Sequence, residues 1–199
     1  IKDVTIPKEK TGREKTIMSF DDFKKIIDDI DINFEDSVVC LTARCEPLKH
    51  PKIIDFIKYA ISKDKIRLII ETSGVFLDKE KADNILEIHN NKLHVIFCLS
   101  ATNEQLYKEI TGNENFKEVE KNIDYYISKQ SENIFLQYTK MGINEDFIDD
   151  FYSRWKKYEE RIIISKYNDY RGELKKDNTH DLTPINRFPC WRLKRDMYI

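Results

Sequence analysis

The feature that most constrains the fold is an alternation of two hydrophobic patterns along the chain. Short apolar runs rich in β-branched residues are separated by longer segments in which apolar residues recur every three or four positions. Because strands joined by helices form right-handed crossovers, this order predicts an α/β domain with a mostly parallel sheet. The strands are expected at residues 37–42, 66–72, 93–100, 133–139 and 161–166.

The segments between these runs carry the start signals of amphipathic helices. Pro51 is expected at the first helical position of the second one, where a missing N–H costs nothing. A short polar side chain precedes each of four other expected helices, and it can accept a hydrogen bond from a free backbone N–H of the first turn. The expected N-caps are Ser19, Asp78, Asn144 and Thr102, the last forming a capping box with Gln105.

The strand runs themselves are almost wholly apolar, which favours strands covered by helices rather than strands with one wet face. Cys40 and Cys98 lie inside such runs and are expected to be buried, inert thiols. A barrel, a partial barrel and an open doubly wound sheet all fit the pattern. In each of them ligands bind at the carboxyl ends of the strands.

Charge and length exclude several classes of protein. The chain has 199 residues, enough for one domain, and its 34 Lys and Arg nearly cancel 36 Asp and Glu, so no overall field attracts nucleic acid or an anionic membrane. No run approaches the roughly 20 apolar residues of a membrane span. We expect a cytoplasmic protein. The four histidines are not at metal-ligand spacing.

Small polar groups follow successive strands. Glu46 lies in the loop after the first, where a carboxylate can hold an ammonium group. After the second strand, hydroxyl groups stand beside a glycine, an arrangement that can bind a carboxylate or a ribose. Each group alone is ordinary for a strand leaving the core, but together they predict a small-molecule pocket. The remaining members are Thr72, Ser73, Gly74, Ser100 and Gln137. Neither a Ser-His-Asp arrangement nor a Gly-rich phosphate loop accompanies them, which disfavours hydrolases and nucleotide triphosphatases.

Three segments in this order resemble the radical SAM superfamily. Glu46 and Pro47 are similar to its GEP segment, with Cys45 in place of Gly. Residues 71–74 resemble its E-T-N-G strand end, with Ser73 in the Asn position, and residues 98–102 resemble its S-L-D-A segment. The similarity runs from Met18 to the end and is closest to the group with a C-terminal SPASM extension, in particular to spirochaete-type SPASM proteins.

The resemblance implies an α/β fold, a partial parallel (β/α)6 TIM-like barrel of radical SAM type with its first strand missing. Residues 19–168 would form this barrel, residues 1–18 an irregular linker, and residues 169–199 a loop leading into the SPASM-like extension. Glu46 and Pro47 would bind the amino group of S-adenosylmethionine. Ser100 would face its ribose and methionyl part, and Gln137 would add a further polar contact.

The family also implies a 4Fe-4S cluster held by a CxxxCxxC loop, and this chain contains no such motif. We therefore expect an excerpt of a longer enzyme that is inactive alone, rather than a degenerate relative. Cys190 resembles the first SPASM cysteine and would ligate an auxiliary iron–sulfur cluster. The intact enzyme would generate a 5′-deoxyadenosyl radical, draw electrons from a ferredoxin or flavodoxin, and abstract hydrogen from a peptide or protein.

Two other functions remain open. The chain could be a catalytically silent barrel that binds a nucleoside-like ligand or a partner protein. It could also be an unrelated α/β enzyme that uses Glu46 as an acid or base, which requires a raised pKa at that carboxyl group.

Overall fold

Five parallel strands form one sheet whose spatial order, β1-β2-β3-β4-β5, follows the chain. This computed structural model describes residues 17–42, 45–130, 132–168 and 177. A doubly wound sheet reverses its strand order at a switch point, whereas this order never reverses and is that of a partial barrel. The strands are β1 (Ser37–Leu41), β2 (Ile66–Thr72), β3 (Leu93–Cys98), β4 (Ile134–Lys140) and β5 (Ile162–Lys166), as predicted within two residues.

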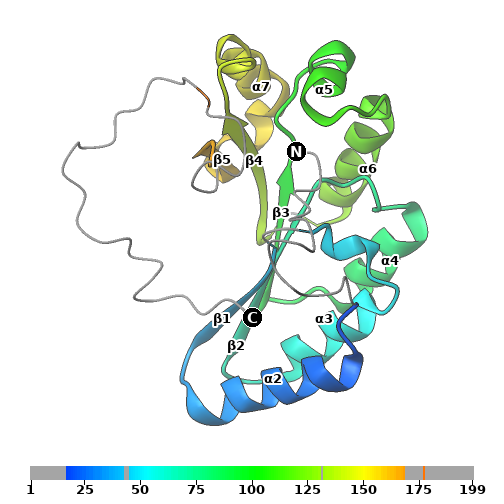
Figure 1. Cartoon of the computed structure of the whole chain (residues 1–199), viewed down its shortest axis with the longest axis vertical. Coiled ribbons are helices and arrows are strands. Elements are labelled where there is room, and N and C mark those ends of the chain that lie inside the picture. Colours follow the sequence, from blue (N-terminus) through cyan, green and yellow to red (C-terminus); the bar gives the residue numbers. More distant parts are fainter. Residues whose placement is uncertain (1–16, 43–44, 131, 169–176, 178–199) are drawn as a thin grey trace, which may run out of the picture.

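Helices connect consecutive strands and lie outside the curve of the sheet (Figure 1). Their apolar stripes pack on its outer face, around the fully buried Phe97, Tyr126 and Trp155. The helices are α2 (Phe20–Asn33), α3 (Ile53–Ser62), α4 (Lys79–Ile88), α5 (Glu104–Thr111), α6 (Phe116–Lys129) and α7 (Ile148–Trp155). Three 3-10 turns accompany them: η1 (Pro47–Lys49), η2 (Glu145–Phe147) and η3 (Lys156–Arg161).

The two faces of the sheet differ in burial. In β2, Ile66, Leu68 and Ile70 are buried under the helices, while the residues between them remain at least partly exposed. The described helices thus cover one face, and the expectation of strands covered on both faces was wrong. Cys40 pairs in register with Ile69 on the open face and is exposed, so its predicted burial was also wrong. An apolar run does not reveal which of its alternating positions meets a helix.

Two of the four predicted N-caps are confirmed. Ser19 Oγ accepts from the Asp22 N–H, and an Asp78 carboxylate oxygen accepts from the Lys81 N–H. The prediction for Thr102 was wrong, because Asn103 accepts from the Leu106 N–H at 2.9 Å and caps α5. Asn144 stands at the predicted N-cap position, before η2 and α7, but it makes no side-chain capping bond, because its side chain is engaged in the loop after β4.

The predicted start of the second helix at Pro51 was two residues too early. Helix α3 begins at Ile53 rather than at Pro51, and it is Pro47 that stands at the start of a helical turn, in η1. Either proline can occupy a first turn, where no N–H is needed. Glu46 supplies the capping side chain that decides between them.

The neighbouring pair Thr102 and Asn103 provides a test of the α5 cap. Replacing Asn103 by alanine should lower the free energy of unfolding by about 1 kcal/mol, because the Leu106 N–H loses its acceptor. Thr102→Val is the matched control. The Thr102 hydroxyl is buried without a hydrogen-bond partner, so removing it should leave stability unchanged or raise it. Urea unfolding measures the free energy of unfolding of both variants. A larger loss of stability for Thr102→Val than for the Asn103 variant would show that Thr102 is the N-cap after all.

Candidate functional site

Glu46 joins the loops that follow β1 and β2. Its Oε1 accepts from the Thr72 hydroxyl at 2.6 Å and from the Leu48 N–H at 3.2 Å. Its Oε2 accepts from the Ser73 hydroxyl at 2.7 Å and from the Ser73 N–H at 2.8 Å. A carboxylate offers about four acceptor positions. The chain itself therefore fills the hydrogen-bonding capacity of Glu46, which ties the two loops together.

The turn after β2 requires the glycine that the sequence places there. Gly74 has φ +78°, and a Cβ at this position would lie 3.3 Å from Ile123 Cγ1 on α6. The Gly74 N–H donates to Thr72 Oγ1 at 3.1 Å, and the Asn122 amide donates to the Gly74 carbonyl at 3.4 Å. Strand β2 and helix α6 thus fix the turn that presents Ser73 to Glu46.

A second set of contacts joins the ends of β3 and β4. Ser100 Oγ accepts from the Thr139 N–H at 3.0 Å, which leaves the Ser100 O–H able to donate elsewhere. The fully buried Asn144 amide donates to the Ser100 and Thr139 carbonyls, both at 2.9 Å, and accepts from the Met141 N–H at 2.7 Å. Asn144 was not predicted to support the site. Its one sequence signal, a polar residue after a strand, equally suited a helix cap.

Polar side chains also line the inner face of the sheet just before the strands end. The Thr42 hydroxyl donates to Glu71, and the Gln137 amide approaches Cys98 Sγ at 3.6 Å. Burial raises the pKa of Cys98 to about 12, and the negative charges of Glu71 and Glu46 add to the effect. Cys98 is therefore a neutral thiol near neutral pH, close to both carboxylates. The prediction that it is unreactive agrees with this pKa, although its side chain is only partly buried.

The predicted site residues fall into two groups at the carboxyl edge of the sheet. Glu46, Pro47, Thr72, Ser73 and Gly74 meet where β1 and β2 end. The others lie beside the end of β3: Ser100 follows that strand, and Gln137, in the middle of β4, is the register partner of Cys98, with the Leu99 N–H donating to its carbonyl at 3.0 Å. Cys190 lies outside the described residues, as do nearly all of residues 1–18 and 169–199.

The described cysteines do not form a metal centre. Within residues 17–42, 45–130, 132–168 and 177, no group of three or more His, Cys, Asp and Glu side chains could hold a metal ion. Cys40 and Cys45 are exposed and Cys98 is partly buried, and these three described cysteines do not come together as the ligands of one cluster. This part of the chain does not fit an iron–sulfur cluster.

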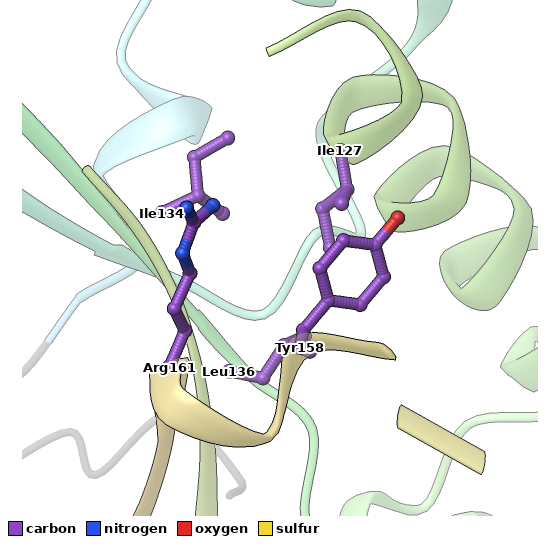
Figure 2. A pocket seen from close by; sticks show the side chains of 5 residues that line it. All are labelled: Ile127, Ile134, Leu136, Tyr158 and Arg161. Atoms are coloured by element: carbon purple, nitrogen blue, oxygen red, sulfur yellow. The ribbon is translucent and has the colours of Figure 1, made fainter. Parts of the chain in front are cut away.

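A crevice at the opposite end of the sheet is a packing seam rather than a ligand site. It lies between α6, the start of β4 and η3, and is too tight to admit a water molecule. Figure 2 shows Tyr158 and Arg161 flanking it, with apolar side chains behind them. Ligands of parallel α/β sheets bind at the carboxyl ends of strands, so this position argues against a role in binding.

The sequence matches the family model described as the Radical SAM superfamily over residues 5–153. The chain belongs to the radical SAM superfamily. No helix in the described part of the chain is long and apolar enough to cross a membrane.

Solved structures share the fold at low sequence identity. Streptococcus suis SuiB bound to precursor peptide SuiA superposes with a TM-score of 0.69, covering 85% of this radical SAM chain and 37% of SuiB at 14% identity. The structure of native anSMEcpe with bound AdoMet gives a TM-score of 0.60, covering 77% of this chain and 44% of anSMEcpe, also at 14% identity. These similarities confirm the α/β partial barrel.

A curated relative comes from Treponema pallidum (strain Nichols), a spirochaete. This uncharacterized protein is 26% identical over 177 residues, which cover 83% of the present chain and 49% of the relative. The chain thus spans about half the length of the curated relative that it matches.

Proposed function

We propose that this chain is the S-adenosylmethionine-binding part of a radical SAM enzyme with a SPASM extension, acting on a peptide or protein. The observation that carries the proposal is the polar edge at the carboxyl ends of β1 to β4, where Glu46 and Asn144 each hold neighbouring loops in one arrangement. The superfamily membership and the fold shared with an AdoMet-bound structure support the choice of ligand.

Each group at this edge has a role that its contacts allow. Glu46 acts by positioning, because its acceptor positions are filled; it orders the backbone around Pro47, against which the amino group of the ligand would bind. The Ser100 O–H donates to the ribose or methionyl part, and the Gln137 amide adds a contact from β4. S-adenosylmethionine, when bound and reductively cleaved, supplies the 5′-deoxyadenosyl radical. The Thr72 and Gly74 contacts keep Ser73 in place.

The iron–sulfur cluster that cleaves the cofactor requires ligands that the described residues do not provide. We expect them in another part of the whole protein, with Cys190 serving an auxiliary cluster and a ferredoxin or flavodoxin as the reductant. After anaerobic reconstitution with iron and sulfide, this chain alone should acquire no stoichiometric cluster and cleave no S-adenosylmethionine. A stoichiometric cluster on it would contradict this division of roles.

Calorimetric titration tests the proposed ligand. S-adenosylmethionine should bind the protein, and Ser100→Ala should weaken binding about tenfold, because one hydrogen bond to the ligand is lost. Ser128→Ala, at an exposed serine on α6, is the control and should bind as the unaltered protein does. No measurable binding, or equal binding by the Ser100 variant, would remove the support for this site.

A catalytically silent barrel is the second candidate, favoured by the lack of cluster ligands in the described part of the chain. Adenosine would then bind as tightly as S-adenosylmethionine, because the methionyl part would contribute no affinity. The third hypothesis, acid–base catalysis by Glu46, loses support. A carboxylate that already accepts four hydrogen bonds has no open position from which to take a proton.

A further inference from the structure

The open face of the sheet carries a row of polar side chains close to its carboxyl edge. Residues paired in register on neighbouring parallel strands point to the same side. Cys40 pairs with Ile69, and Glu71 pairs with Ile96, so these positions share the inner face. We call one row near the edge the inner band; it consists of Thr42, Glu71, Cys98 and its register partner Gln137, one from each of four successive strands or the loop that follows.

Glu71 differs from Glu46 in how its charge is satisfied. Glu46 accepts four hydrogen bonds, whereas Glu71 accepts one side-chain hydrogen bond from the residues that the structure describes, from the Thr42 hydroxyl. No Lys, Arg or His of the described residues forms an ion pair with Glu71. Arg67, which shares the inner face on the same strand, pairs instead with Asp36. Among the described residues, the Glu71 carboxylate therefore retains acceptor positions, and no ion pair compensates its charge.

The described neighbours of Glu71 on the inner face do not offset that charge. Cys98 is a neutral thiol and Gln137 a neutral amide, and Glu46 adds a second negative charge nearby. Glu71 is partly buried, where an ionic contact is screened less than it is at the open surface. Ile69, two residues earlier on β2, and Ile96, the register partner of Glu71 on β3, supply apolar surface next to it on the same face. This combination suits the end of a long side chain with a cationic head and an aliphatic stem.

We infer that Glu71 binds a cationic group, an ammonium or guanidinium, of a second ligand that enters the barrel beside the cofactor. The inference rests on the proposed function, because it takes the second ligand to be the peptide substrate. It narrows that class to peptides presenting lysine or arginine. A neutral side chain of the same shape would leave a partly buried carboxylate unpaired, so the site rejects it.

Binding of two matched tripeptides tests the inference. With the protein saturated by S-adenosylmethionine, acetyl-Gly-Lys-Gly-amide should bind at least tenfold more tightly than acetyl-Gly-norleucine-Gly-amide, measured by calorimetry or chemical-shift titration. Glu71→Gln should abolish this difference and leave the affinity for S-adenosylmethionine within twofold. Glu87→Gln removes an exposed carboxylate on α4 and should preserve the difference.

Each other outcome is decisive. Equal binding of the two tripeptides would overturn the inference. A Glu71→Gln variant that loses S-adenosylmethionine would place Glu71 in the cofactor site and overturn it as well. If the Glu71→Gln variant does not fold, a tripeptide with acetyl-lysine in place of lysine serves as the test on the unaltered protein, because acetylation removes the charge of the side chain. If this acetylated peptide binds as tightly as the lysine peptide, the cationic contact is refuted. If S-adenosylmethionine fails to bind the unaltered protein, the proposed function fails, while the lysine–norleucine comparison without cofactor still decides the role of Glu71.

Discussion

Asn144→Ala is expected to lower the free energy of unfolding by about 3 kcal/mol or more. The change removes three hydrogen bonds of a fully buried side chain. The Ser100 carbonyl, the Thr139 carbonyl and the Met141 N–H each lose their bond to Asn144. Each buried polar group left unsatisfied costs roughly 1–3 kcal/mol. Urea unfolding followed by circular dichroism measures the loss.

Asn113→Ala is the matched control for this prediction. Asn113 is exposed in the turn between α5 and α6, and truncation there should change stability by less than about 0.5 kcal/mol. Binding gives a second readout. Because Asn144 holds the backbone of Ser100, the folded variant should also bind S-adenosylmethionine more weakly than the Asn113 variant does. A stability loss below about 1 kcal/mol would show that Asn144 does not organise the ends of β3 and β4.

The strands could be predicted from the sequence because short runs rich in β-branched residues stand out between segments with helical periodicity. Their order in space could not, since a partial barrel and an open sheet share the same strands. The burial of Cys40 was mispredicted for a related reason. Its run is apolar on both alternating faces, and only the register with Ile69 shows that it lies on the uncovered one. Composition identifies a strand without identifying the face that each residue occupies.

The candidate site shows the same division between residue type and geometry. The polar edge was predictable, because small polar residues follow each buried strand. Which acceptor positions are filled was not, since Thr72 and Ser73 reach Glu46 from 26 and 27 residues away along the chain. The roles of Thr102 and Asn103 were exchanged because both side chains can cap, and the backbone conformation selects one. The direct contact of Ser100 with the cofactor and the positioning role of Glu46 remain predictions.

Glu46→Ala should have the largest effect on cofactor affinity, about 100-fold for S-adenosylmethionine. The variant leaves the Leu48 N–H, the Ser73 N–H and two hydroxyls without their shared acceptor, so the loops after β1 and β2 lose their connection. Stability should fall by about 2–3 kcal/mol, less than the sum of four buried bonds, because the junction is only partly buried and water can replace some of them.

A double-mutant cycle separates positioning by Glu46 from an independent contribution. Ser73→Ala removes one donor to the carboxylate, and Glu46→Ala removes the acceptor, so each change eliminates the same hydroxyl contact. The double variant should therefore be more stable than the sum of the two single losses predicts, with a coupling of about 1 kcal/mol. Ser128→Ala, combined with Glu46→Ala in the same way, should show no coupling. Additive losses for Glu46 and Ser73 would mean that the carboxylate does not tie the β2 turn, and the positioning role would then be wrong.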